Sequence, residues 1–201
     1  MMPAPNPRFR LLALFKRVWT DDCASQIVEF ALSMPLLVVF VVGIFDFSGA
    51  VSLRQKLTNA AREGARVAAA DPANDVGATP SGVPPASVAD AFYVVDNYLI
   101  SEKIADCGLN LDEPVQTGGT LTWKSIATAS PCGSTTALIL TINRGCVTQQ
   151  TINGATVNVI GTCVTIQYPY NWQYGKFAGL VGGRFIGPTS LSATATAFNE
   201  N

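Results

Sequence analysis

Two carboxylates, Glu29 and Asp46, lie near the ends of the most apolar stretch of the chain, residues 27–47. Paired carboxylates share a proton or a substrate only when they lie within several ångströms of each other. On a helix, the spacing of these two corresponds to roughly 25 Å, so they cannot act together within one chain. Carboxylates inside a membrane are candidate functional residues individually. We interpret Asp46 as a solvated end residue, whereas Glu29, followed by Phe30 and the apolar run, is the stronger candidate.

The residue types that most hydrolases and many metal sites require are scarce. The chain has no histidine, which excludes Ser-His-Asp triads, Cys-His pairs and His-containing zinc sites. Its cysteines are too far apart to form a CxxC redox pair or a zinc knuckle. The serines, threonines and aspartates of the C-terminal half form no recognisable nucleophile motif. The sequence therefore supports no enzyme, and we expect neither a metal nor a cofactor.

Composition narrows the class of protein further. The 201 residues suffice for one domain with an appendage. Only 13% of them are charged and the net charge is −1, against roughly 25% charged residues in ordinary soluble proteins. A disordered or nucleic-acid-binding chain would need far more charge. We therefore expect no nucleic-acid partner.

Residues 27–47 have the length and composition of a membrane span. About 20 helical residues cross a ~30 Å hydrocarbon core, and residues 36–42 lack the polar face of a buried core helix. A secretory signal cleaved near Ala50 is the alternative, although this apolar run exceeds the usual length of such signals. Within about 20 positions, equal numbers of basic residues precede and follow the span, so the positive-inside rule gives no orientation. Four of the five cysteines follow the span, which favours a cytoplasmic N-terminus and an oxidising compartment for the rest.

Helical periodicity continues beyond the apolar run. Residues 48–70 contain no proline, and small or apolar residues recur there at steps of three and four. The pattern predicts one helix over 25–70, with a length on the order of 70 Å. Gly64 and Ala65, in an alanine-rich turn, favour close packing against another helix. Asp71-Pro72 ends this helix.

The C-terminal part reads as a small α+β domain. Residues 71–86 form a Pro/Gly/Ala/Ser linker. Ser87 is interpreted as the cap of a second helix with a stripe of apolar residues: Val88, Phe92, Val95, Leu99 and Ile100. Strands are expected at 121–127, 137–143, 156–168 and 191–198, with turns at Asn143-Arg144-Gly145 and Asn153-Gly154. Short connections imply an antiparallel sheet with the helix on one face.

Two motifs resemble a known family. The run ASQIVEFA at residues 24–31, followed by Pro35-Leu36-Leu37, resembles the processing region of TadE-like pseudopilins of the tight-adherence (Tad/Flp) pilus system. Gly43, Asp46, Gln55 and the run AAREGAR at 60–66 resemble the rest of that family's N-terminal signature. The two pieces are fairly specific jointly and weak singly.

The resemblance implies a pilin-like fold and a minor, non-enzymatic pilus subunit in a bacterial inner membrane. It places prepilin-peptidase cleavage between Ala24 and Ser25, although the usual residue before the cut is glycine. Glu29, Phe30 and Pro35 belong to the assembly and processing motif, with Glu29 pairing with the terminal amine of an adjacent subunit. The implied divisions are a cytoplasmic leader 1–24, the transmembrane and stalk helix 25–70, the linker 71–86 and an extracytoplasmic domain 87–201. The implied partners are the peptidase, other Tad/Flp pilins and pseudopilins, the pilus assembly platform and membrane lipid.

Removal of that leader takes away Cys23 and leaves an even number of cysteines. Cys107, Cys132, Cys146 and Cys163 then allow three disulfide connectivities. Pairing Cys107 with Cys132 and Cys146 with Cys163 keeps both loops short, and four buried free thiols are the alternative.

Two other functions remain open. A single-pass, membrane-anchored extracytoplasmic binding protein would not be cut before Ser25. A secreted ligand-binding module would be cut near Ala50 instead.

Overall fold

The computed structural model describes residues 22–77, 83–117, 121–133, 136–152, 154–172 and 188–199. The chain divides into two compact units, Met1–Phe47 and Ser48–Asn201, and the boundary falls within helix α2 (Asp22–Ala70). The helix begins three residues before the predicted start and ends at the predicted residue. Residues 1–21 of the expected leader lie outside the described part of the chain.

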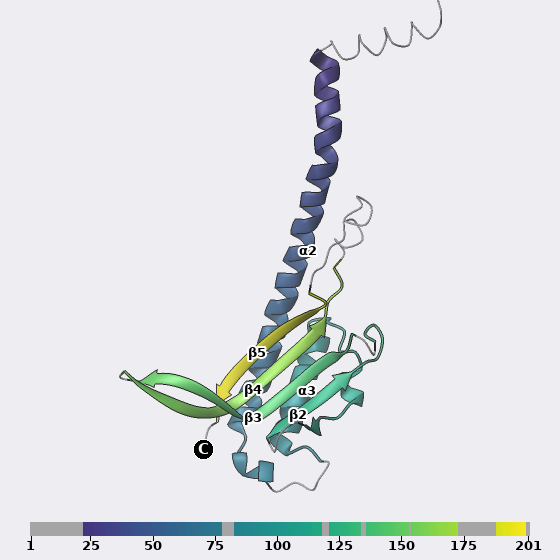
Figure 1. Ribbon diagram of the computed structural model, residues 1–201. Helices are drawn as coiled ribbons and strands as arrows, with labels where there is room; N and C mark the ends of the chain where they lie inside the picture. Colours follow the sequence, from purple (N-terminus) through teal and green to yellow (C-terminus); the bar gives the residue numbers. More distant parts are fainter. Residues whose placement is uncertain are drawn as a thin grey trace, which may run out of the picture. The chain divides into compact units, whose positions relative to one another are not determined.

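The second unit combines helices with an antiparallel sheet (Figure 1). After α2 come the 3₁₀ helix η1 (Ala73–Gly77), helix α3 (Ala86–Ser101) and the 3₁₀ helix η2 (Leu109–Leu111). The described residues form five strands, paired in the order β1-β2-β3-β4-β5: β1 (Val115–Gln116), β2 (Thr122–Ala127), β3 (Leu138–Ile152), β4 (Ala155–Pro169) and β5 (Ser190–Phe198). The long apolar helix, the second helix and this sheet confirm the predicted α+β class.

The core of the second unit lies between the helices and one face of the sheet. Alternate residues of β3, such as Leu138, Leu140 and Ile142, are buried because successive strand residues point to opposite faces. They form one cluster with Leu57 and buried alanines of α2 and with Val88, Phe92, Val95 and Leu99 of α3. The opposite face carries threonines, and the Thr165 and Thr194 hydroxyls there lie 3.0 Å apart.

The start of α3 differs from the prediction that Ser87 caps it. Pro85 occupies the N-cap position, and no cap hydrogen bond comes from its side chain. The backbone N–H of Ser87 instead donates to the Asp75 carboxylate of η1 at 2.9 Å. A carboxylate from the expected linker therefore satisfies an N–H of the first turn. In the predicted apolar stripe, Ile100 is 52% exposed and the other four residues are buried.

The β3–β4 hairpin is longer than predicted. The predicted turn at Asn143-Arg144-Gly145 is wrong, because β3 continues to Ile152 with a register shift between Asn143 and Cys146. The predicted turn at Asn153-Gly154 does connect β3 to β4, and Gly154 has φ of 80°. Asn153 lies outside the described residues.

Candidate functional site

The first half of α2 exposes large apolar side chains. Within the described residues, α2 is the one helix long and apolar enough to cross a membrane. An 18-residue window near its N-terminus has a mean hydropathy of 2.5, and no part of that window is buried. Phe30, for example, is 66% exposed. Such a segment suits a membrane anchor or a signal sequence, since both bury an apolar helix in lipid.

The motif residues of this segment lie on one continuous helix. Ala24 and Ser25 are in the first turns of α2, and Glu29 is exposed shortly after them. The helix continues through Pro35. Asp46 is only 9% exposed, which contradicts its interpretation as a solvated end residue.

The second half of α2 has a buried face of small residues. Ala60, Ala61, Gly64, Ala65 and Ala68 are all buried, at helical steps of three and four. A Cβ atom added at Gly64 would lie 2.6 Å from Cγ2 of Val95 and 3.4 Å from the backbone oxygen of Ala91. The close approach of α2 to α3 therefore requires glycine at this position.

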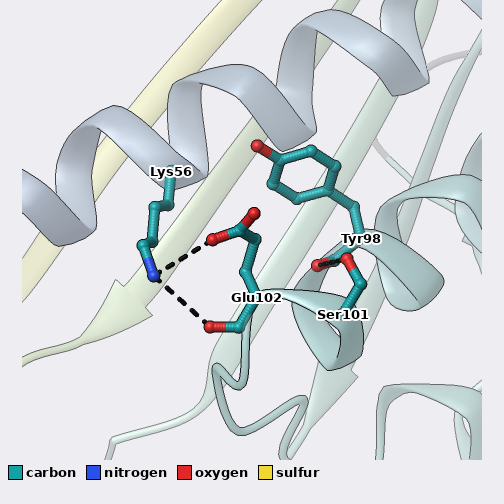
Figure 2. A network of polar contacts seen from close by, with 4 residues as sticks. All are labelled: Lys56, Tyr98, Ser101 and Glu102. Atoms are coloured by element: carbon teal, nitrogen blue, oxygen red, sulfur yellow. Dashed lines mark hydrogen bonds and ion pairs between the residues drawn. The ribbon is translucent and has the colours of Figure 1, made fainter.

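A polar contact joins α2 to the C-terminal end of α3 (Figure 2). The Nζ atom of Lys56 lies 3.0 Å from the Glu102 carboxylate and donates to the Glu102 backbone oxygen at 3.4 Å. Glu102 is the C-cap residue of α3, where a cation complements the negative end of the helix dipole. Because both side chains are partly exposed, the ion pair contributes about 0–1 kcal/mol. Apolar packing is thus the larger contribution to the contact between the two helices.

Two disulfides cross-link the second unit. Cys107–Cys132 joins the segment after α3 to the β2–β3 connection, with 5.5 Å between the Cα atoms. Cys146–Cys163 joins β3 to β4, with 5.7 Å between the Cα atoms. These are the two pairs that keep the loops short. Because disulfides persist in oxidising compartments, they suggest that this unit is extracytoplasmic.

Sequence reasoning missed a buried cation at the register shift in β3. The Arg144 guanidinium donates to the backbone oxygen of Asp71 at 3.0 Å and to the Thr162 hydroxyl at 3.4 Å. The Asn199 amide donates to the Arg144 backbone oxygen at 3.2 Å. Burial lowers the pKa of Arg144, while the carboxylates of Asp75 and Asp71 act in the opposite direction. This network joins the end of α2, strands β3 and β4, and the residue after β5. Its role is therefore structural.

A second buried polar group was also missed. Asp96 interrupts the apolar residues of α3 and is almost fully buried. Burial, and then the nearby charge of Asp106, raise the pKa of the Asp96 carboxyl, and the same two causes raise the pKa of Tyr168. Tyr168 also lines an open cleft of about 520 Å³ with Pro131, Tyr170 and Asn171. Among the described residues that line the cleft, none is an aspartate, glutamate, lysine or arginine.

Comparison with known proteins bears on the N-terminal region. A family model described as TadE-like protein matches residues 24–66, which are 43 of the 201 residues. The match begins at Ala24, includes Glu29 and Pro35, and ends at Arg66. No curated protein and no solved structure matches the chain. The expected resemblance is confirmed: residues 24–66 are a TadE-like region, which implies that the protein takes part in Tad pilus assembly.

Proposed function

We propose that the chain is a minor pilin-like subunit of a Tad/Flp-type pilus system. The observation that carries this proposal is the family match over 24–66, which runs from the expected cleavage position through the exposed apolar segment. In this role, residues 27–47 anchor the subunit in a bacterial inner membrane with the N-terminus in the cytoplasm. The disulfide-linked unit lies outside. Its partners are a prepilin peptidase, other Tad/Flp pilins and pseudopilins, and the assembly platform.

The proposed processing step removes residues 1–24. The peptide bond between Ala24 and Ser25 is hydrolysed, and Ser25 gains a free α-amino group. Because alanine stands where the family usually has glycine, Ala24→Gly is expected to accelerate cleavage.

After cleavage, Glu29 has a partner within reach. The α-amino group of Ser25 is largely protonated near neutral pH. A carboxylate at the edge of a membrane is costly unless it is paired with a cation. The amine of the same chain lies about one helical turn from Glu29. In a bundle of subunits, the amine of a neighbour at the same depth can take its place and fix the axial register between helices.

The exposed side chains of α2 support the same assembly. Ile27, Phe30 and the large residues that follow are exposed on all sides of the helix. A helix that is apolar all round must be covered by lipid or by other helices. The same surface can therefore leave lipid and pack among neighbouring subunits, chiefly by van der Waals contact.

Glu29→Gln tests this function, because it retains the size of the side chain and removes the charge. Glu113→Gln is the matched control, since Glu113 is exposed and lies in the second unit, outside the matched residues 24–66. We expect Glu29→Gln to retain cleavage. Co-purification with other pilin-like subunits and surface piliation should each fall by at least about tenfold, because a charged pair is lost. The control should change neither.

Two outcomes would revise the proposal. Unchanged association and piliation in Glu29→Gln would remove the assembly role of the charge. Loss of cleavage in that variant would assign Glu29 to recognition by the peptidase.

The alternative function is a membrane-anchored extracytoplasmic binding protein outside any pilus. The cleft lined by Tyr168, Tyr170 and Asn171 favours it, because it combines aromatic and polar groups. This alternative predicts an uncut chain and normal piliation when the protein is deleted.

A further inference from the structure

The β3–β4 hairpin extends past its neighbouring strands. Strand β2 pairs with β3 only as far as Asn143, and β5 pairs with β4 only from Gly161 onward. Residues 147–152 and 155–160 pair with each other beyond those points, and we call them the β-arm. Figure 1 shows the β-arm continuing past the rest of the sheet. Among the described residues, no strand pairs with either outer edge of the β-arm.

The surface of the β-arm is apolar or neutral and largely exposed. Val147 and Ile160, which face each other across the hairpin, are each 60% exposed, and Val157 is exposed as well. The sequence has no charged residue between Gly145 and Gly175, and the β-arm contains no proline. Protective lysines and prolines commonly prevent free strand edges from pairing with other chains. The β-arm has neither, so its edges are open to strand addition.

The base of the β-arm is fixed within the second unit. The Cys146–Cys163 disulfide links its two strands where the register shifts. The hydrogen bonds of Arg144 to Asp71 and of Asn199 to Arg144 hold the adjoining residues. A two-stranded hairpin alone is marginally stable. A fixed base reduces the ordering cost that a partner must offset.

We propose that the β-arm docks edge to edge with the β-arm of a second copy of this chain, through residues 155–160 of each. Antiparallel pairing centred on Asn158 is symmetric, so the same residues serve both copies. It places Val157 of each copy opposite Val159 of the other, and Thr156 opposite Ile160. Cross-strand pairs of β-branched residues each contribute about 0.2–1 kcal/mol relative to alanine pairs.

Charge and side-chain type favour a copy of the same chain and this particular edge. Identical edges that carried charge would place like charges opposite each other, which destabilises a sheet. A neutral edge is compatible with its own copy. On the other edge, symmetric pairing centred on Gln149 would place Thr148 opposite Gln150, with no pair of apolar residues.

The contact is small compared with a stable interface. Stable complexes bury about 1,200–2,000 Å² in total, and two six-residue edges bury far less. The pairing is therefore weak for free molecules and effective where subunits share a membrane and are concentrated. It does not depend on processing or on incorporation into a fibre.

Disulfide trapping in vesicles tests the symmetric register. The full-length chain with Cys23→Ser and Asn158→Cys is reconstituted in phosphatidylcholine vesicles and oxidised. The control carries Gln149→Cys, because Gln149 lies directly opposite Asn158 in the hairpin but on the other edge. We expect disulfide-linked dimers at least ten times more abundant for Asn158→Cys than for Gln149→Cys. Equal yields, or no dimer from Asn158→Cys, would overturn the proposal.

A charge swap tests whether the partner is a second copy. One chain carries Val157→Cys and the other Val159→Cys, each with Cys23→Ser. If both also carry Asn158→Lys, repulsion should reduce the mixed disulfide at least tenfold. If one carries Asn158→Lys and the other Asn158→Glu, the yield should return. Equal yields in the two mixtures would overturn this register and assign the contact to another surface, such as the free edge of β5.

Discussion

The two halves of helix α2 differ in side-chain size and in burial. In the first unit, residues 27–47 carry large apolar side chains that are mostly exposed. In the second unit, the buried face of α2 consists mainly of alanines and Gly64. The first half has no polar face, which is what a helix surrounded by lipid requires. The second half has a narrow stripe of small residues that contacts α3. The difference indicates that a single helix serves two environments, and mutations should affect the two halves differently.

The largest expected effect comes from a matched pair of leucines. Leu57 is fully buried in the second unit, whereas Leu37 is 62% exposed in the first. Leu57→Ala should lower the free energy of unfolding of the second unit by about 2–5 kcal/mol, because it leaves a cavity. Leu37→Ala should change it by less than about 0.5 kcal/mol. Denaturant unfolding of the detergent-solubilised chain, followed by fluorescence of the buried Trp123, measures both. Equal effects would contradict the division of the helix.

Loss of a disulfide should weaken the second unit alone. Cys107 and Cys132 are 25 positions apart, and replacing both by serine should cost about 3 kcal/mol by freeing the unfolded chain. Cys23→Ser is the control, with no effect on unfolding. Membrane association should be unchanged in both variants, because it depends on residues 27–47. If the double substitution released the chain from membranes, the two regions would not be independent.

Alanine substitutions at two glycines of α2 should have smaller effects on stability, and these effects should be opposite in sign. Gly64→Ala should destabilise the second unit by about 1–2 kcal/mol, since the new Cβ would overlap Val95. Among the described residues, a Cβ atom added at Gly49 would meet only the Tyr170 hydroxyl, at 3.4 Å. Gly49→Ala should stabilise the helix by up to about 1 kcal/mol through better helix propensity. Thermal unfolding of both variants gives the signs, and stabilisation by Gly64→Ala would contradict close packing of α2 against α3.

The smallest effect concerns a charge in the core beside α3. Burial, and then the charge of Asp106, raise the folded-state pKa of the Asp96 carboxyl above its unfolded-state value. Protonation of Asp96 therefore favours the folded state, and this contribution to stability is complete below the unfolded-state pKa of about 4. That contribution is lost as the pH rises through the folded-state pKa. Asp96→Asn should therefore stabilise the second unit at pH 7 by on the order of 1 kcal/mol and have little effect near pH 4. Unfolding curves across this range test the sign, and a constant difference would refute it.

The sequence predicted the helices of this protein better than its longest hairpin. Spacings of three and four marked α2 through Ala68, and Asp71-Pro72 marked its end, because both signals are local. The same was true of the apolar stripe of α3 from Val88 to Leu99. The N-terminal resemblance was also visible, since its motifs occupy one continuous segment.

The errors concern groups whose partners lie far away in the sequence. Asn143-Arg144-Gly145 has the composition of a turn, yet Arg144 is buried by contacts with Asp71 and Thr162. Ser87 has the residue type of a cap, yet its backbone N–H is bound by Asp75. Neither contact could be predicted from local pattern, because tertiary packing decides which partner is available.

The most direct measurement of the central claim is the intact mass of the chain extracted from membranes, in cells with and without prepilin peptidase. We predict a chain that begins at Ser25 when the peptidase is present, and the full-length chain when it is absent. This result would leave residues 27–47 in the mature subunit, as a membrane and assembly helix requires. Only full-length chain in the presence of the peptidase, or a chain that begins near Ala50, would contradict the account.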